Sequence, residues 1–306
     1  LRRQQLLYWQ EPMPPKTPDP LTPPLSIGQC ATLACLLEAT APKVGNVHRG
    51  ADFENLTFAD FVVSAVAISP AMEACSNPLQ RVSVGATILE AIRATRQLVD
   101  TNTNLGMVLL LAPLATVPRQ EPLASGIRKV LRSLSAGDSR LIYEAIRLAQ
   151  PGGMGKVEEM DIAAQPPDNL LVAMAGAAER DLVAQQYVTD FDLVLSKVAP
   201  WLSESANRCS LTDAIIHTHL RLLSVYPDSL IARKCGLEMA REVSTYAAAV
   251  LAAGSPGDDA YHEAAADLDF FLRSDGNRRN PGTIADLIAA GLFALLRDGK
   301  LQPPLR

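Results

Sequence analysis

The sequence predicts an all-α protein folded as a single, bundle-like, multi-helix domain. Apolar residues recur at helical spacing along most of the chain, and alanine and leucine dominate these segments. Runs in which β-branched and polar residues alternate, as strands require, are nearly absent. The 306 residues are 48% hydrophobic and 20% charged, which separates the chain from disordered proteins. We therefore expect helices packed on helices over residues 26–306.

Residues 1–25 are predicted to form an arm outside this domain. The stretch 11–25 is dense in proline, which removes backbone donors and blocks helix propagation. Ser26 follows as a good N-cap for the first helix, whose apolar positions include Ile27 and Cys30. The first ten residues, LRRQQLLYWQ, are basic, but no apolar segment and no small-residue cleavage site follow them, so we expect no signal peptide.

The later elements follow from the same periodicity. We expect helices over about 57–74, 82–99, from 104 onward, 121–135, 138–149, 168–187, 190–202, 210–225, 228–253, 258–273 and 283–298. The last has the clearest period, with Ile284, Leu287 and Ile288 on one face. Loops near 151–153 and 255–257 interrupt the pattern, and the first is a candidate hinge between two helical halves.

The composition argues against nucleic acid and membranes as binding partners. The net charge of −5 gives no basic surface for nucleic acid, and no stretch reaches the roughly 18 uninterrupted apolar residues of a membrane span. The five cysteines are odd in number and lack a C-x-x-C pair, which favours free thiols in the cytoplasm over a disulfide framework. We expect a cytoplasmic protein with small-molecule partners, and a homodimer stays open.

A polar cluster follows the first helix at residues 40–55. It offers two cations, Lys43 and Arg49, the imidazole of His48, and the carboxylates of Asp52 and Glu54. Cations contact phosphate oxygens directly, whereas carboxylates usually do so through Mg²⁺. The alternative is a solvated loop whose charges pair with one another.

A second polar cluster, residues 100–106, directly precedes an apolar run. Asn102, Thr103 and Asn104 can cap the buried helix that this run predicts. The N-terminus of such a helix can equally bind an anion, because its free N–H groups and dipole favour negative charge. The sequence leaves both interpretations open.

A third cluster lies between residues 213 and 234. Asp213 and His217 share a helix face and, with His219, suggest either a metal site or ordinary helix-surface histidines, the second being favoured. Asp228 is a candidate N-cap. Arg233, one turn further on, would face a phosphate.

The fourth cluster precedes the last helix. Asn280-Pro281 forces a turn, and Thr283 and Asp286 have the spacing of a capping box. This explanation leaves the pair Arg278-Arg279 without a role. None of the common nucleotide fingerprints, such as G-x-x-x-x-G-K-[ST] or G-x-G-x-x-G, is present, so a phosphate site here would be of the helix-end type.

Taken in order, the clusters resemble the triphosphoribosyl-dephospho-CoA synthase family over residues 28–298. PKVGNVHR at 42–49 resembles P-K-P-G-L-V-D-R, and GADFEN at 50–55 stands where the family carries G-x-H-x-D-M. TNTNLG at 101–106 resembles G-V-N-T-H-K-G, and DSLIARK at 228–234 resembles D-T-N-x-x-x-R-G. NPGTIADL at 280–287 is close to N-P-G-G-x-A-D-L.

The resemblance implies an all-α fold and an unusual transfer. The 2′-hydroxyl of 3′-dephospho-CoA attacks C1′ of the ATP ribose, and adenine leaves. It implies that phosphates are held by Lys43, Arg49 and Arg233, and that Asp52 and Glu54 bind Mg²⁺ or act as base. The other implied site residues are His48 in catalysis, Asn46, Asn102, Thr103, Asn104 and Asn280 in substrate binding, and Asp286 in positioning the last helix.

Three departures from the family pattern bear on the substrate. Asn104-Leu105 replaces His-Lys, His48 replaces an aspartate, and Asp52-x-Glu54 replaces H-x-D. They resemble a divergent branch, so an enzyme of C1-carrier coenzyme synthesis acting on another phosphoribosyl compound or nucleotide is one alternative. A non-catalytic helical nucleotide-binding protein is another, and it predicts that the four clusters do not meet in one pocket.

Overall fold

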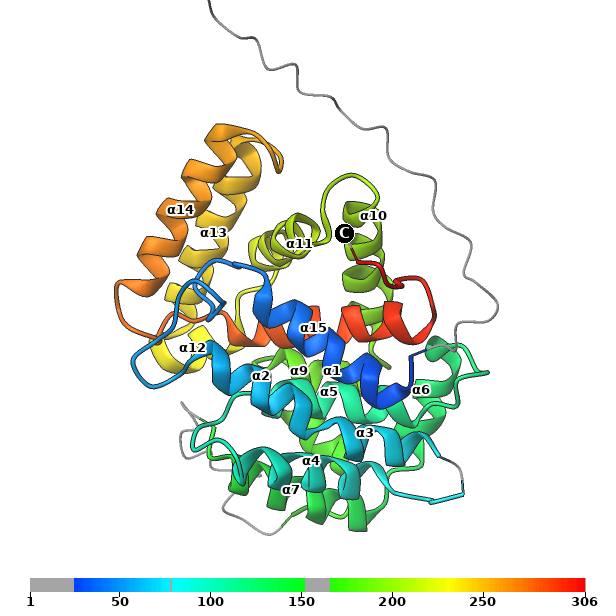
Figure 1. Cartoon of the computed structure of the whole chain (residues 1–306). Coiled ribbons are helices and arrows are strands. Elements are labelled where there is room, and N and C mark those ends of the chain that lie inside the picture. Colours follow the sequence, from blue (N-terminus) through cyan, green and yellow to red (C-terminus); the bar gives the residue numbers. More distant parts are fainter. Residues whose placement is uncertain (1–24, 78, 152–165, 306) are drawn as a thin grey trace, which may run out of the picture.

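The computed structural model describes residues 25–77, 79–151 and 166–305, and these are helical almost throughout (Figure 1). The predicted all-α class is confirmed, since the described residues hold no strand beyond two isolated bridges, His48–Ala51 and Phe53–Leu56. The predicted arm, apart from Leu25, and the glycine pair after Pro151 lie outside the described residues.

Helix α15 (Gly282–Arg297) forms the centre of the molecule. Figure 1 shows it running across the middle with α1 (Ile27–Thr40) in front of it. It also packs against α5 (Leu105–Thr116), α10 (Ala199–Ala206) and α11 (Leu211–Val225). Its predicted inward stripe is buried, and so are most other positions. A helix that is apolar all round has to be buried on all sides, which places this one in the core.

The remaining helices cover this centre in pairs. Helices α4 (Val84–Arg96) and α7 (Ala136–Ala149) pack along each other at one end, and α13 (Leu237–Ala253) and α14 (Asp259–Arg273) form a hairpin at the other (Figure 1). The shorter elements between them are α6 (Leu123–Arg132), α8 (Leu170–Ala177) and α9 (Leu182–Val188).

Four predicted helices are interrupted. The segment 57–74 divides into α2 (Phe58–Ala67) and α3 (Ser69–Ser76), because Pro70 in the first turn of α3 cannot donate to the preceding turn. The segment 168–187 divides into α8 and α9, and Gly236 separates α12 (Ser229–Cys235) from α13. The segment 190–202 begins with a π-helical turn (Val194–Val198) before α10. Apolar periodicity continues across these breaks, so it does not reveal them.

The helix starts confirm two predicted caps and correct a third. Ser26 caps α1 in a capping box with Gln29, and Asp228 caps α12. The expected capping box at the last helix is wrong. Pro281 is the N-cap of α15 and makes no side-chain cap, while Thr283 lies inside the helix. Asp228 accepts the N–H of Ile284 instead, because the two helix starts lie together.

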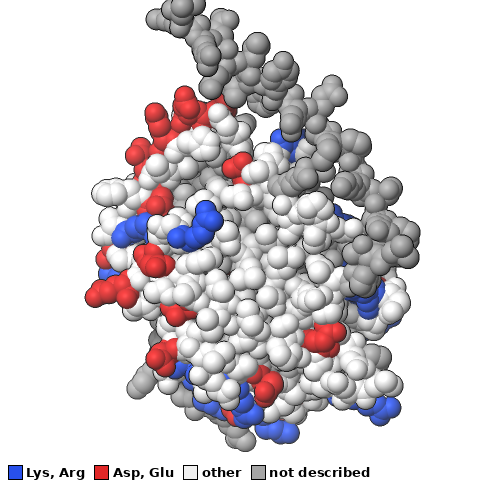
Figure 2. Space-filling model, in the orientation of Figure 1, with Lys and Arg blue, Asp and Glu red and all other residues white. Residues whose placement is uncertain are grey.

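The surface carries its charge unevenly. Figure 2 shows acidic side chains gathered at the corner where α13 and α14 lie, and few charges over α1 to α3. Phe58–Ser76 is apolar and long enough to cross a membrane, with a third of its most apolar window buried. It is the broken pair α2–α3 packed on α1, so it is weak support for a membrane span. All five cysteines are free, as predicted.

Candidate functional site

Three of the polar segments meet at the start of α15. The amide of Asn46 donates to Asn280 Oδ1 at 2.6 Å, across 234 positions of sequence. A Cβ atom on Gly106 would lie 2.0 Å from Asp286 Oδ2, so only glycine lets the start of α5 approach this carboxylate. The loop 40–55, the turn 101–106 and the start of α15 therefore come together. The scattered arrangement that a non-catalytic protein predicts is not observed.

Four carboxylates gather at this point: Glu38, Asp181, Asp228 and Asp286 form the central carboxylate cluster. Burial raises the pKa of Asp286 well above its ordinary value, and the other three carboxylates, Glu38 foremost, raise it further. Arg233 alone acts in the opposite direction. Asp286 as a residue is partly exposed, and its carboxylate makes no hydrogen bond or ion pair with the described residues. It is the member of the cluster that stays available to a ligand.

In Asp228, by contrast, both carboxylate oxygens already accept hydrogen bonds from the backbone. This residue is buried, and Oδ1 accepts the N–H groups of Leu230 and Ile231 at 2.8 and 3.0 Å, while Oδ2 accepts that of Ile284 at 2.8 Å. Burial raises its pKa to about 6 against the opposing effect of these N–H donors. Asp228 thus joins the starts of α12 and α15.

Lys43 does not hold an exposed position. Its side chain is 0% exposed, and Nζ pairs with Glu38 Oε1 at 2.8 Å and donates to the carbonyl oxygens of Glu38 and Ala41. Burial raises the pKa of Glu38, and Lys43 acts against that rise. The chain turns directly after α1, which returns this ammonium to the last turn of the helix it has just left. The structure therefore gives Lys43 a structural partner in the place of the expected phosphate.

The rest of the first cluster lines the rim of the loop. Arg49, Asp52 and Glu54 are exposed, and Asp52 Oδ1 accepts the N–H of Phe58 at 2.7 Å. His48 is half-buried, and burial followed by the charge of Arg273 lowers its pKa, so the imidazole is neutral at pH 7. Among the described residues, no group of three or more His, Cys, Asp or Glu side chains can hold a metal ion by itself. Magnesium binding by Asp52 and Glu54 stays a prediction.

The second cluster is tied into the fold by its side chains. Asn102 Oδ1 accepts the N–H of Leu105 at 3.1 Å, so the capping interpretation is confirmed for this residue. The buried amide of Asn104 donates to Thr95 at 3.0 Å. The hydroxyl of Thr103 lies 2.6 Å from that of Ser64 on α2. Anion binding at this helix start stays a prediction.

Arg233, the predicted phosphate ligand of the third cluster, lies beside the central carboxylate cluster. Its guanidinium pairs with Asp181 at 2.7 Å, and Asp181 also caps the start of α9. An anionic ligand would therefore have to share this guanidinium with Asp181.

Two residues on α14 hold the first loop, and sequence reasoning missed both. Asp269 Oδ1 accepts the N–H of Gly45 at 2.7 Å, and Arg273 Nε contacts both oxygens of Asp269 at 2.9 Å. Arg273 also donates to the carbonyl of Asn46 and lies 5.2 Å from the Phe53 ring centroid. Gly45 has φ +72°, which an L side chain rarely adopts. The Asp-Arg spacing of i, i+4 was visible in the sequence, but nothing local indicated its target.

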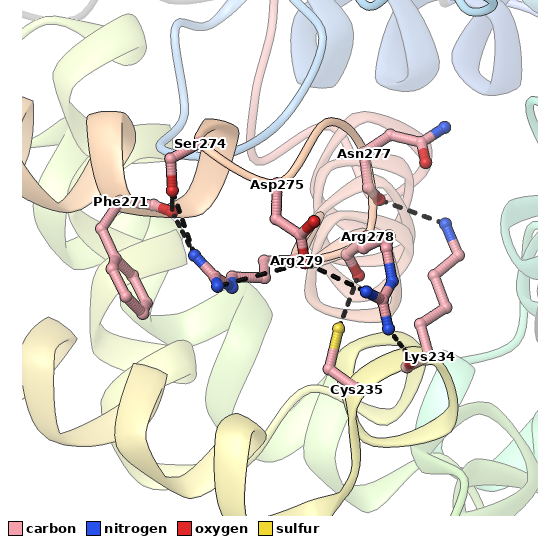
Figure 3. A network of polar contacts seen from close by, with 8 residues as sticks. All are labelled: Lys234, Cys235, Phe271, Ser274, Asp275, Asn277, Arg278 and Arg279. Atoms are coloured by element: carbon pink, nitrogen blue, oxygen red, sulfur yellow. Dashed lines mark hydrogen bonds and ion pairs between the residues drawn. The ribbon is translucent and has the colours of Figure 1, made fainter.

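The arginine pair before α15 has a structural role. Figure 3 shows Arg278 reaching the carbonyl of Lys234 at the end of α12 and the carboxylate of Asp275, at 3.2 and 3.3 Å. Arg279 donates to the carbonyl of Phe271 at 3.0 Å and stacks over its ring at 4.5 Å. The pair therefore fastens the turn before α15 to the ends of α12 and α14.

The histidines of the third cluster do not form a metal site. His217 Nδ1 lies 3.3 Å from the Tyr261 hydroxyl. The favoured helix-surface position is wrong for His219, which is completely buried. Burial, together with the positive charge of Lys43, lowers its pKa to about 3. Both imidazoles belong to the packing between α11 and its neighbours.

The chain is similar to one family of known proteins. The model of the family described as ATP:dephospho-CoA triphosphoribosyl transferase matches residues 24–303. A crystal structure from Archaeoglobus fulgidus, provisionally named a triphosphoribosyl-dephospho-CoA synthase, is 28% identical to this chain. The similarity covers 77% of this chain and 98% of that one, with a TM-score of 0.60. A search of the curated proteins finds no significant match.

Proposed function

The chain belongs to the ATP:dephospho-CoA triphosphoribosyl transferase family, and from this premise we propose that adenine is its leaving group and that Asp286 is its general base. In this reaction the 2′-hydroxyl oxygen of 3′-dephospho-CoA forms a bond to C1′ of the ATP ribose, and the bond from C1′ to adenine breaks. The hydroxyl proton goes to a base, and the departing adenine takes up a proton. The triphosphate stays on the product.

The observation that carries the proposal is the meeting of the matched segments at one place. The starts of α5 and α15 lie together at Gly106 and Asp286, and neither helix has a side-chain cap from its N-cap residue. Asn102 accepts the N–H of Leu105 and Asp228 that of Ile284, so the attraction for phosphate comes mainly from the positive ends of the two helix dipoles. Such a site explains how a protein of net charge −5 holds a triphosphate.

Asp286 has the properties of a base for a ribose hydroxyl. It is the available member of the central carboxylate cluster, and its raised pKa makes it a stronger proton acceptor than an exposed carboxylate. Asp52 and Glu54 are exposed, so water competes for their oxygens. We therefore assign proton transfer to Asp286 and keep Asp52 and Glu54 for the metal.

Phosphate binding falls to Arg49 and Arg233. Arg49 is exposed and makes no ion pair with the described residues, so its guanidinium is free to contact a polyphosphate. Arg233 is paired with Asp181 and can exchange that partner for phosphate. The amides of Asn46 and Asn280 bond to each other, which holds the loop edge that would face the nucleotide.

Magnesium fits as a companion of ATP. Asp52 keeps one carboxylate oxygen outside its bond to Phe58, and Glu54 lies two residues further along the same rim. A magnesium ion that arrives on a triphosphate needs only one or two carboxylates and keeps several waters. When bound, it would neutralise triphosphate charge. We place the enzyme in the cytoplasm, where its five free thiols stay reduced.

The direct test is product formation from ATP, Mg²⁺ and 3′-dephospho-CoA, followed by chromatography and mass spectrometry. We expect free adenine and a triphosphoribosylated product in equal amounts. Asp286→Asn should abolish both while the protein stays folded, and Asp267→Asn, on the exposed face of α14, should leave both unchanged. Absence of adenine with the wild-type protein would exclude the proposed reaction.

One observation favours a second candidate acceptor. At the positions where the family has His-Lys, Asn104 is bonded to Thr95 and Leu105 is buried, so neither presents a charged group to a ligand. The same assay with other ribose-containing acceptors, including phosphoribosyl compounds of C1-carrier coenzyme synthesis, tests this alternative. Adenine release that depends on such an acceptor, and not on 3′-dephospho-CoA, would support it.

A further inference from the structure

A groove lies between the 42–48 loop, α11 and α14. Its volume is about 360 Å³, within the range of roughly 300–1,000 Å³ typical of small-molecule pockets. Its apolar walls come from all three elements and include Val44, Ile216, Ala265 and Ala266. Nothing in the proposed transfer uses this space.

Two imidazoles in the groove are fixed as hydrogen-bond donors. His48 Nδ1 accepts the N–H of Gly50 at 3.1 Å, and His262 Nε2 accepts the N–H of Gly257 at 3.3 Å. A neutral imidazole carries its proton on the nitrogen that does not accept. His48 therefore presents Nε2–H, and His262 presents Nδ1–H, as a single donor each.

The carboxylates of the groove differ in availability. Both oxygens of Asp269 contact Arg273, and one also accepts the N–H of Gly45. In Asp213, Oδ2 accepts the hydroxyl of Ser210, and Oδ1 has no hydrogen bond with the described residues. The groove thus offers two N–H donors and one carboxylate acceptor between apolar walls, which suits a chain of alternating aliphatic and amide groups.

The charge around the groove excludes a polyphosphate as its occupant. The α14 side carries Asp258, Asp259, Glu263 and Asp267, which are exposed, and Figure 2 shows acidic side chains gathered at this corner. Carboxylates at this density repel phosphate. In the central carboxylate cluster, Lys43 and Arg233 offset the charge of Glu38 and Asp181, whereas these four exposed carboxylates make no ion pair with the described residues. A neutral ligand portion is therefore favoured in the groove.

We infer that this groove binds the pantetheine-type arm of the acceptor, a neutral chain with two secondary amides. This inference rests on the proposed function, because it assigns the arm of the acceptor whose ribose hydroxyl reacts beside Asp286. Amide carbonyl oxygens accept from His48 and His262, and an amide N–H donates to Asp213. The 42–48 loop contacts both regions, since Val44 and His48 line the groove and Lys43 pairs with Glu38 of the central carboxylate cluster, so one extended acceptor reaches from one to the other.

The test compares acceptors with and without the arm. Ala266 is exposed and lines the groove, so Ala266→Trp fills it without disturbing the core, and Asp267→Trp, next to it and outside the groove, is the matched control. Binding of 3′-dephospho-CoA and of ADP, which shares the adenosine diphosphate portion but lacks the arm, is measured by calorimetry. Ala266→Trp should weaken 3′-dephospho-CoA at least tenfold and leave ADP within twofold, and Asp267→Trp should change neither.

The outcomes separate this inference from the proposed function. Unchanged 3′-dephospho-CoA binding in Ala266→Trp, or an equal loss for ADP, overturns the groove assignment even if the wild-type enzyme releases adenine. A wild-type protein that binds no 3′-dephospho-CoA overturns it as well. A third outcome is that the wild-type protein binds 3′-dephospho-CoA but releases no adenine, while Ala266→Trp weakens 3′-dephospho-CoA and not ADP. That result supports the groove assignment and rejects the proposed chemistry.

Discussion

Lys43 gives the sharpest test of the structure, because the sequence and the fold assign it different roles. The resemblance makes it a phosphate ligand, whose loss would lower nucleotide affinity and leave stability unchanged. In the structure its ammonium is buried against Glu38, with side-chain exposures of 0% and 3%. Lys43→Met keeps most of the volume and removes the charge.

The expected cost follows from burial. Removing one partner of a buried ion pair leaves the other charge uncompensated and costs about 3–5 kcal/mol, whereas an exposed pair is worth about 0–1 kcal/mol. Arg93–Glu144, with exposures of 49% and 48%, is the internal control. We expect Lys43→Met to lower the free energy of unfolding by about 3–5 kcal/mol and Arg93→Met by less than about 1 kcal/mol.

Urea unfolding with linear extrapolation measures both variants. The loss in Lys43→Met should grow with pH, because Glu38 already has a raised pKa and loses the partner that lowers it. The folded state then retains a proton that the unfolded state releases, so stability falls as pH rises. The double variant Glu38→Gln/Lys43→Met should recover most of the loss. A Lys43→Met protein as stable as wild type, with weaker ATP binding, would refute this reasoning.

Four further predictions follow from the same region. Gly106→Ala should abolish turnover and cost about 1–3 kcal/mol in urea unfolding, because its Cβ would lie 2.0 Å from Asp286 Oδ2; normal turnover would show that the two helix starts can separate. Asp286→Asn should remove adenine release and raise stability slightly at pH 8, since it removes a carboxylate from a repulsive cluster; a destabilised variant would make Asp286 structural. The pKa of Asp228 is raised from 3.8 to about 6, so between these values the native state retains a proton that the unfolded state releases, and stability is lost as pH rises. In unfolding measured from pH 4 to 7, Asp228→Asn should lack this fall in the free energy of unfolding that the wild type shows. The pKa of His219 is lowered from 6.5 to about 3, so between these values only the unfolded state gains a proton, and stability is lost as pH falls below 6.5. His219→Leu should therefore lose less stability on acidification than the wild type. An equal loss in both proteins would contradict the burial of a neutral imidazole.

Much of the fold follows from local sequence. Helical periodicity located nearly every helix. The residues that cap α1 and α12, Ser26 and Asp228, were identified from sequence because the N–H groups that a cap satisfies lie in the next turn of the chain. The four breaks were missed, since Pro70 and Gly236 interrupt helices whose apolar spacing continues on either side. The polar segments that carry the family pattern were also found, because they stand out against apolar helices.

The roles of individual side chains were decided by tertiary structure. The sequence places Lys43 in a polar loop, and only the return of that loop onto α1 buries its ammonium beside Glu38. Arg278 and Arg279 had no local partner, and theirs lie on α12 and α14. Asp286 has the spacing of a helix cap, yet its chemistry comes from Gly106, about 180 residues earlier, and from carboxylates on other helices. Backbone hydrogen bonds within a helix are local and therefore readable from sequence. The burial and the charge state of a side chain depend instead on the residues that pack against it in the folded protein, and those residues lie far away in the chain.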